Sequence, residues 1–210
     1  MGDLVGSETV TSVTGLHAAF NEAIERLNDE RRAEIASPLT VTLGDEFQGL
    51  CRSLSTGLSI IRTLRRRLLA SRIDCRFVLG VVRLETPLNT DRAWNMMGPG
   101  LAGSREKLAD KRDPNVYRFH LPDNPTIERL LEAVGLSISS VESAWTDRQV
   151  EIVAASLDHQ GLHADLAARL GVSQRAFYKV RRAARLDFYE SLWNAVEHAI
   201  GDLDRSYGFR

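Results

Sequence analysis

The patterns typical of β-strands all lie before Pro122, and the chain after it shows only helical spacing. A short first strand is expected around Asp3, and apolar or β-branched runs follow at 39–51, 75–85 and 116–121. Amphipathic helical spacing separates these runs, at 16–35, 54–69 and 104–111. Strands followed by a run of helices predict an α+β module joined to an all-α module.

The expected order in the first module is strand, helix, hairpin, helix, strand, helix, strand, with the helices on one face of the sheet. This order is typical of the ferredoxin-like fold. We therefore predict a ferredoxin-like palm domain over residues 1–122, a helical linker over 123–145 and a helix-turn-helix domain over 146–210. Helices of the second module are expected at 126–134, 146–157, 163–170 and 173–200.

Pro38 and a run of three arginines give two further predictions for the first module. Pro38 is expected to end the first helix, so that the hairpin begins directly after it. The run Arg65-Arg66-Arg67 lies within the second helix. We expect these three arginines on a solvated face of that helix.

The net charge argues against binding of nucleic acid or membranes through the overall charge of the chain. The 210 residues carry a formal net charge of -1, so any nucleic-acid site must be a local basic patch. The start of the chain lacks the basic and apolar regions of a signal peptide, and no apolar run reaches membrane-spanning length. Cys51 and Cys75 have no metal-ligand spacing and are expected as buried free thiols. These features predict a cytoplasmic protein with no membrane partner.

The stretch LTVTLGDEFQGL, residues 39–50, sets two adjacent carboxylates at the tip of the expected hairpin. Hard cations such as Mg²⁺ take carboxylate oxygens and leave coordination positions for phosphate oxygens. We therefore predict a metal site made of Asp3, Asp45 and Glu46. The alternative is that the hairpin carboxylates only cap backbone groups of the turn. Asp3 has only two residues before it, which predicts either a short first strand or a natural start further upstream.

Three blocks of the sequence resemble the SatD family of bacterial proteins: GDLVGS at 2–7, TLGDEFQGL at 42–50 and GPGLAGSREKL at 98–108. The family is associated by name with secretion and acid tolerance. More distantly, the aspartate of the first block and the Gly-Asp hairpin resemble class III nucleotide cyclases and GGDEF diguanylate cyclases. That resemblance implies a palm in which Asp3 and Asp45 hold Mg²⁺ or Mn²⁺ with a nucleotide. It also implies nucleotide contacts from Gly44, Gly98 and Arg105.

The same segments depart from the cyclase pattern. Leu43 stands where GGDEF enzymes have their first glycine, and Ala102 stands where cyclases have an asparagine. Arg105 is one residue short of the place of the transition-state arginine. Because losing one preorganised donor lowers the rate by about 10²–10³, the residues favour a palm without catalysis, whose site either still binds a nucleotide or is vestigial. A metal-dependent nucleotide cyclase or nucleotidyl-transfer enzyme is the alternative.

The segment HADLAARLGVSQRAFYKVRRAAR, residues 163–185, resembles the helix-turn-helix of sigma-factor region 4 and of response regulators. Such a motif needs a small residue where the helices cross, a glycine in the turn and an apolar residue on the buried face of the second helix. Ala167, Gly171 and Phe177 occupy these places. Thr146 and Ser173 are expected to cap the helices that follow them.

Residues 174–185 contain five basic side chains and no acidic one. Because a recognition helix inserts its first turns into the major groove, Gln174, Arg175 and Tyr178 are predicted to face bases. The other basic residues, Lys179, Arg181, Arg182 and Arg185, complete the basic patch, and the three arginines are predicted to contact phosphates. The alternative is a protein-binding adaptor whose arginines are solvated.

An apolar stripe continues along the last helix, at Leu186, Tyr189, Leu192, Trp193, Val196 and Ile200. We expect it either to close the three-helix core or to pair with a second copy, and a homodimer would suit an operator with two half-sites. The leading hypothesis is a SatD-like, DNA-binding transcription regulator whose palm senses a nucleotide.

Overall fold

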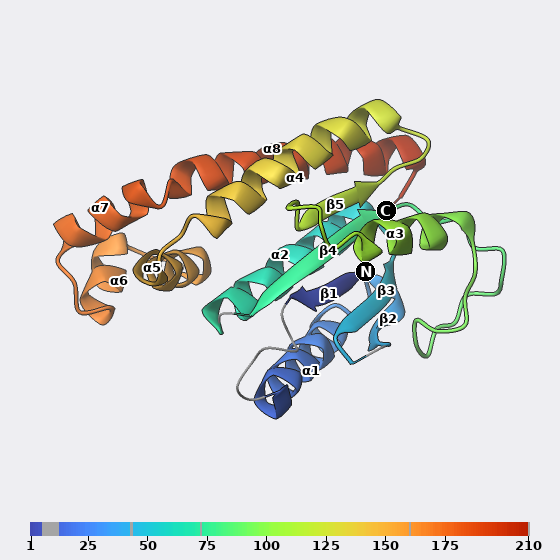
Figure 1. Cartoon of the computed structure of the whole chain (residues 1–210), viewed down its shortest axis with the longest axis horizontal. Coiled ribbons are helices and arrows are strands. Elements are labelled where there is room, and N and C mark those ends of the chain that lie inside the picture. The colour runs from blue at the N-terminus through green and yellow to red at the C-terminus, as the bar shows by residue number, and fades with distance from the viewer. Residues whose placement is uncertain (6–12, 43, 72, 160, 210) are drawn as a thin grey trace.

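The computed structural model describes residues 1–5, 13–42, 44–71, 73–159 and 161–209. These residues form five strands and eight helices, with the sheet at one end of the molecule and three short helices at the other (Figure 1). In chain order the elements are β1 (Gly2–Val5), α1 (Val13–Glu30), β2 (Ile35–Val41), β3 (Glu46–Cys51), α2 (Leu54–Ala70), β4 (Asp74–Gly80), α3 (Pro99–Ala109), β5 (Tyr117–His120), α4 (Pro125–Ser143), α5 (Asp147–Asp158), α6 (His163–Arg169), α7 (Gln174–Ala183) and α8 (Leu186–Tyr207).

The five strands form one sheet in the order β2-β3-β1-β4-β5. β1 pairs antiparallel with both β3 and β4, and β2 pairs antiparallel with β3. β5 is parallel to β4, so the sheet is mixed. The α+β class predicted from the sequence is therefore confirmed, and the four-residue β1 is the central strand.

Helices cover both faces of the sheet, although the sequence predicted them on one face only. Adjacent residues of a strand point to opposite faces. Leu79 of β4 packs against Gly57 of α2, whereas its neighbour Gly80 lies against Ser104 of α3. The sheet therefore separates α2 from α3.

Two element boundaries differ from the expected ones for physical reasons. Pro38 lies inside β2 instead of ending a helix, which a strand tolerates here because β2 is at the sheet edge and its pairing with β3 shifts register near Ser37. The expected last helix is divided into α7 and α8 at Arg185, whose φ of 56° lies in the left-handed region. α3 also begins earlier than expected, with Pro99 in its first turn.

One core joins the sheet to α8. Phe77 of β4 stacks on Tyr117 of β5, and Tyr117 meets the ring of Trp193 edge-on at a centroid distance of 4.9 Å. The apolar stripe of α8 belongs to this core, whereas the sequence had suggested that it closes the three-helix unit or meets a second copy. The stripe lies here because α8 packs against both α2 and α4, and α4 packs on β5 (Figure 1).

A buried ion network also fixes α4 and α8 to the sheet module. Glu142 of α4 accepts a hydrogen bond from Arg65 Nε at 2.9 Å and one from each hydroxyl of Tyr117 and Tyr189 at 2.7 Å. The exposed fraction of the Arg65 side chain is 7% and that of Glu142 is 3%. The prediction that Arg65 is solvated is wrong, because Arg65 lies one turn after the buried Ile61 on the same helical stripe.

A second buried carboxylate, Asp204 of α8, caps α2. Its two oxygens accept hydrogen bonds from the backbone N–H groups of Leu54 at 2.7 Å and Ser55 at 2.8 Å. Ser53 supplies the local cap by accepting from the N–H of Thr56. The N-terminus of α2 is thus satisfied by residues close in sequence and by a residue from the last helix.

The helices α5, α6 and α7 form a small unit with its own core. Ile152, Leu166, Ala167 and Phe177 are buried together, and Val172 and Val180 pack against them. Thr146 and Ser173 cap α5 and α7 as predicted, and Thr146 forms the full capping box with Gln149. Figure 1 shows this unit at the end of the molecule that is distant from α3 and β2.

Candidate functional site

The three predicted metal-site residues lie at two neighbouring strands: Asp3 is in β1, Glu46 begins β3, and Asp45 directly precedes Glu46. Asp3 lies directly opposite Glu46 of β3 and opposite Arg76 of β4, so these three side chains share one face of the sheet. The backbone oxygen of Asp45 accepts a hydrogen bond from Leu4 N–H at 3.0 Å, which holds the hairpin tip beside β1. Asp45 and Glu46 are half-buried.

The carboxylate of Asp3 is fully buried and is surrounded by positive charge. Lys111 Nζ lies 3.3 Å from its Oδ2, and a guanidinium nitrogen of Arg76 lies 3.7 Å from the same oxygen. Neither oxygen of Asp3 makes a well-aligned hydrogen bond within the described part of the chain. Burial raises the pKa of Asp3 above its ordinary value, Lys111 and Arg76 oppose that rise, and the charge of Asp45 adds to it.

This arrangement tests whether a metal ion fits at the hairpin. Within the residues that the structure describes, no three His, Cys, Asp or Glu side chains gather closely enough to hold an ion. The negative charge of Asp3 is instead balanced by the cationic side chains of Arg76 and Lys111. The described geometry therefore does not itself form a metal site, and the site of Asp3, Asp45 and Glu46 stays a prediction.

The three glycines of the GPGLAGS segment have a packing role that the sequence did not reveal. A side chain at Gly98 would collide with the backbone oxygen of Arg83, and one at Gly100 would collide with that of Val81. A side chain at Gly103 would collide with the ring of His120. These glycines let α3 pack directly on the chain that follows β4 and on β5.

The predicted nucleotide contacts lie at three different places. Gly44 is exposed at the hairpin tip with a φ of +77°, the left-handed conformation that glycine favours. Gly98 is the N-cap of α3. Arg105 is exposed and donates to Gln48 Oε1 at 3.2 Å, and Gln48 shares a sheet face with Glu46. Gly44 thus lies at the hairpin tip and Arg105 contacts the hairpin strand β3 through Gln48, and nucleotide binding stays a prediction for all three.

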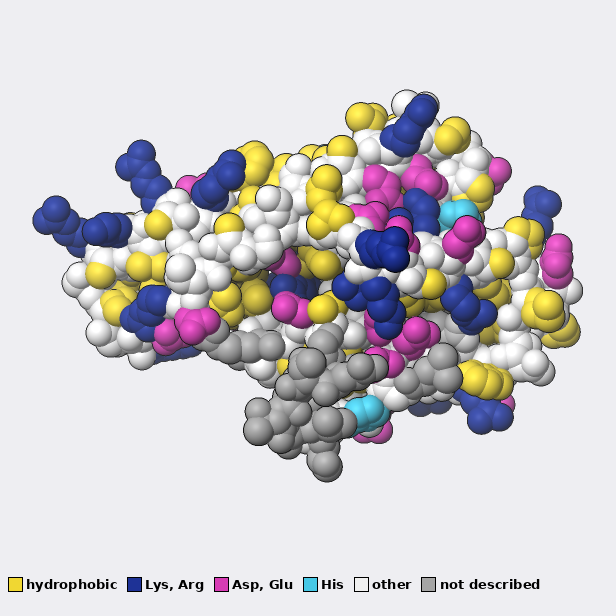
Figure 2. Space-filling model, viewed as in Figure 1, with side chains coloured by type: hydrophobic (Ala, Val, Ile, Leu, Met, Phe, Trp, Pro, Cys, Tyr) yellow, Lys and Arg dark blue, Asp and Glu magenta, His cyan; other side chains and the backbone are white. Residues whose placement is uncertain are grey.

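A cleft of about 440 Å³ lies beside the ion pairs of Asp3, between the sheet module and the junction of α4 and α5. Arg76 and Lys111 line one side of it, and Glu142, Trp145 and Asp147 line the other. Figure 2 shows the surface hollowed here, with basic and acidic side chains at the rim. Since both charge signs line the cleft, its charge alone selects neither an anion nor a cation.

The second candidate site is the outer face of α7. Gln174, Arg175, Tyr178 and Lys179 are exposed there, while Phe177 of the same helix is fully buried. Arg182 and Arg185 are exposed further along. Figure 2 shows basic side chains projecting from the end of the molecule where Figure 1 places α7.

Arg181 differs from the other basic residues of α7 because it turns inward. Its guanidinium lies 2.8 Å from His163 Nε2 of α6 and 3.4 Å from a carboxylate oxygen of Asp187 of α8. The exposed fraction of its side chain is 12%. Burial lowers the pKa of His163, and the charge of Arg181 lowers it further. Arg181 thus joins three helices.

The comparisons with known proteins agree with the blocks that the sequence brought forward. A model of the SatD family matches residues 1–198. The chain belongs to the SatD family. No curated protein and no solved structure matches it. None of the helices in the described part of this SatD-family chain has the length and apolar character needed to cross a bilayer.

Sequence reasoning missed two features of the SatD-family chain for the same reason. The period of apolar residues in α2 shows which stripe is buried, and Arg65 lies on that stripe, but nothing local identifies Glu142 as its partner 77 residues away. The spacing of apolar residues in α7 likewise does not show that Arg181 faces α6 and α8. In both cases the available signal was a charged residue on an apolar face, which requires a buried partner.

Proposed function

We propose that α6 and α7 act as a helix-turn-helix through which this SatD-family protein binds DNA, and that the protein regulates transcription. The observation that carries the proposal is the exposed basic face of α7 at the far end of the molecule. A helix that buries one apolar residue and exposes a continuous basic face has the character of a recognition helix.

The connection between α6 and α7 supports this proposal. α6 ends at Arg169 and α7 begins at Gln174, so four residues join them. Gly171 in this turn has a φ of +65°, and apart from its chain neighbours no atom of the described residues lies within 4 Å of the position where its side chain would begin. Ser173 accepts a hydrogen bond from Ala176 N–H and fixes the start of α7. This is the connection that a helix-turn-helix requires.

The exposed residues divide into two groups by position. Gln174, Arg175 and Tyr178 lie in the first turns of α7 and would face base edges. Arg182 and Arg185 lie at its other end and would contact phosphates, and the guanidinium of Arg185 is held 4.4 Å over the ring of Phe188. We exclude Arg181 from the contact surface because its side chain joins α6, α7 and α8.

The sheet module supplies the other part of the proposal. Its strand order β2-β3-β1-β4, with every neighbouring pair antiparallel, supports a ferredoxin-like palm to which β5 is added. We propose that this palm senses a nucleotide with Mg²⁺ or Mn²⁺ and does not convert it. Lys111, whose side chain is 58% exposed, would have to leave the carboxylate of Asp3 for an ion to bind there.

The experiment that tests DNA binding is fluorescence anisotropy on DNA from the region upstream of the protein's own gene, across a salt series. The variant Arg175→Ala/Lys179→Ala removes two charges from α7. The matched control, Arg26→Ala/Arg205→Ala, removes two exposed charges from α1 and α8. We expect the α7 variant to bind about tenfold more weakly or worse, with a shallower salt dependence, and the control to bind normally.

Two outcomes would overturn the proposal. Absence of salt-dependent binding would favour a protein-binding adaptor, and an equal loss in the control would indicate nonspecific charge attraction. The sensing part has its own test, namely titration calorimetry with ATP or GTP and Mg²⁺ or Mn²⁺. Unchanged metal-dependent binding by an Asp45→Asn variant would contradict a site at the hairpin, and conversion of the nucleotide would indicate an enzyme.

A further inference from the structure

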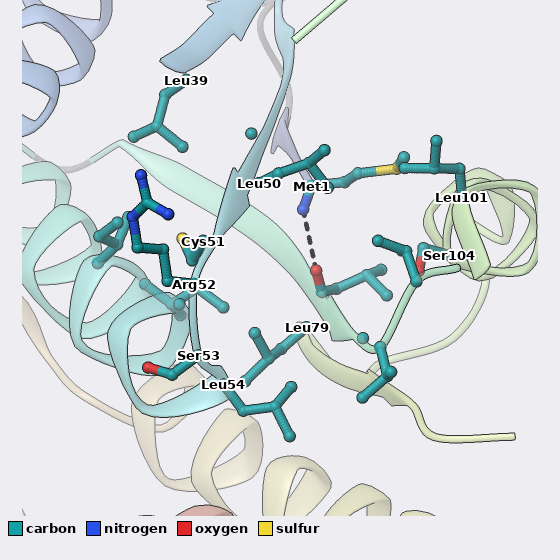
Figure 3. A pocket seen from close by; sticks show the side chains of 18 of the residues that line it. Met1, Leu39, Leu50, Cys51, Arg52, Ser53, Leu54, Leu79, Leu101 and Ser104 are labelled. Atoms are coloured by element: carbon teal, nitrogen blue, oxygen red, sulfur yellow. Dashed lines mark hydrogen bonds between the residues drawn. The ribbon is translucent and has the colours of Figure 1, made fainter. Parts of the chain in front are cut away.

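The cleft of about 440 Å³ between the sheet module and the α4–α5 junction has the size of a small-molecule site. Its lining comes from β4, from the turn after α3 and from the start of α5. The cavity shown in Figure 3, of about 210 Å³, is smaller and is lined mainly by apolar side chains. Arg52 of that lining donates to the backbone oxygen of Ala33. The larger cleft is therefore the better candidate for a polar ligand.

The acidic side chains of the cleft already have partners within the protein. Glu142 accepts hydrogen bonds from Arg65 and from two tyrosine hydroxyls. Asp74 pairs with Arg65 at 3.1 Å, and Asp113 pairs with an arginine of β5 at 3.2 Å. Asp147 lies in the first turn of α5, where the helix dipole stabilises its negative charge. These carboxylates therefore do not require a cationic ligand.

The basic side chains of the cleft, in contrast, keep hydrogen-bond donors available. Lys111 Nζ and a guanidinium nitrogen of Arg76 lie 3.3 Å and 3.7 Å from Asp3 Oδ2, but neither makes a well-aligned hydrogen bond with it. The Nε of Arg76 is buried, and no group of the described residues accepts from it. Arg112 is exposed next to Lys111 and also lines the cleft. Because guanidinium and ammonium groups bind phosphate oxygens well, the available donors favour an anion that carries phosphate.

The opposite wall of the cleft carries an aromatic ring that is connected to α7. Trp145 is half-buried and lines the cleft. Its Nε1 donates to the backbone oxygen of Ala184, the C-cap of α7, at 2.8 Å. Its ring meets that of Tyr189 of α8 edge-on, with the centroids 5.0 Å apart. A ligand that packs on Trp145 therefore touches a residue that is bonded directly to the end of α7.

We propose that this cleft binds the nucleotide that the palm is proposed to sense, and that Trp145 transmits binding to α7. The phosphates accept hydrogen bonds from Arg76, Lys111 and Arg112, and the base packs on the ring of Trp145. This inference rests on the proposed sensing function. It places the ligand away from Gly98, where the chain is closely packed.

The effect on α7 follows from where the ligand lies. A nucleotide that bridges Lys111 and Trp145 holds the start of α5 and the end of α7 in one position relative to the sheet module. The α5–α7 unit has a core of its own, and this core does not fix that position. A ligand that binds one such position better than others changes the affinity of α7 for DNA, and couplings of this kind are typically about fivefold or more.

The first experiment locates the nucleotide by titration calorimetry of the full chain with ATP, GTP or inorganic phosphate in buffer with Mg²⁺. The variant Lys111→Ala/Arg112→Ala removes two donors from the cleft. The matched control, Arg83→Ala/Arg92→Ala, removes two exposed side chains from the loop that follows β4. We expect the cleft variant to bind the nucleotide about 100-fold more weakly and the control to bind it normally. Arg112→Ala alone leaves the ion pair of Lys111 intact, and we expect a loss of about tenfold even if the double variant does not fold.

The second experiment tests the connection to α7. Trp145→Phe keeps a ring for the base and removes the donor to Ala184. We expect the variant to bind the nucleotide within about threefold of the natural chain. In fluorescence anisotropy the nucleotide should change the DNA affinity of the natural chain about fivefold or more, and that of the variant not at all. Amide exchange in α7, with and without nucleotide, reports the same connection and does not depend on DNA binding.

Each way of failing points to a different conclusion. If the cleft variants bind the nucleotide normally and Asp45→Asn does not, the nucleotide lies at the hairpin, and the sensing proposal stands without this inference. If inorganic phosphate binds as tightly as ATP and GTP, the cleft is an anion pocket in which Trp145 has no part. If Trp145→Phe keeps the effect of the nucleotide on α7, the proposed connection is wrong. If neither nucleotide binds, this inference and the sensing proposal both fail, and DNA binding by α7 is still tested by itself.

Discussion

The two ends of the molecule are held together in different ways. The sheet end has a large core that runs from α1 through the sheet to α8 and contains the buried network of Glu142. Among its described residues, the α5–α7 end has a separate core of four fully buried side chains, supplemented by contacts of Arg181. The basic face of α7 thus lies on the less extensively packed part, and binding surfaces often occupy such parts because they open most easily.

The largest expected effect comes from breaking the buried ion network of the sheet end. Glu142→Ala removes the buried partner of Arg65, which keeps only its ion pair with the exposed Asp74, and removes the acceptor of two tyrosine hydroxyls. We expect the free energy of unfolding to fall by about 3–5 kcal/mol, measured by urea denaturation. Glu22→Ala, which breaks an exposed ion pair with Arg26, is the control and should change it by less than about 1 kcal/mol. A loss for Glu142→Ala no greater than the control would contradict the role of the network.

A matched pair of leucines compares the two cores directly. Leu64 in the main core and Leu166 in the small core are both fully buried, and replacing either with alanine should cost about 2–5 kcal/mol. We expect Leu64→Ala to lower the melting temperature of the whole chain. Leu166→Ala should speed amide exchange only in α5–α7 and abolish DNA binding. Equal loss of protection across the sheet in both variants would show that the chain is one cooperative unit.

A smaller effect is expected at the cap that α8 provides for α2. Asp204→Ala removes the acceptor of two buried N–H groups, and we expect a loss of about 1–3 kcal/mol in thermal or urea unfolding. Asp202→Ala, which removes an exposed carboxylate from the same helix, is the control and should be nearly neutral. A neutral result for Asp204→Ala would mean that water replaces the cap.

The smallest effect concerns pH. Burial and Arg181 lower the pKa of His163 in the folded state, so the folded chain binds a proton there less readily than the unfolded chain. Stability of the α5–α7 unit should therefore fall as the pH drops through the ordinary histidine range toward the lowered pKa. The groups that face His163 are Arg181, His159, Glu190 and Asp187. Amide exchange at pH 7 and pH 5.5 should show this loss in the natural chain and a smaller one in His163→Gln.

Local sequence patterns predicted the elements well. The order of strands and helices, the caps at Thr146 and Ser173, and the buried places of Ala167 and Phe177 all follow from residues within a few positions of one another. They were predictable because helix period, strand alternation and capping depend on near neighbours. The α+β class follows from the same patterns.

The candidate sites were predictable only in part. The sequence identified the hairpin carboxylates and the basic stretch of α7, and the structure places Asp3 beside Glu46 and exposes most of that stretch. It did not show that Asp3 lies against Lys111, or that Arg181 turns inward, because these contacts join residues of different elements. Gly98 was predicted to contact a nucleotide, yet the close contacts of the GPGLAGS glycines are with the backbone after β4 and with β5.

The sequence by itself determined which residues form helices and strands and which stripe of each is apolar. Only the tertiary structure decided what each stripe contacts: the α8 stripe packs on the sheet module, and Arg65 on the apolar stripe of α2 pairs with Glu142. The physical reason is that the spacing of apolar residues along a helix or strand shows which of its side chains point toward the core. Its partner is fixed by the packing of elements that lie far apart along the chain.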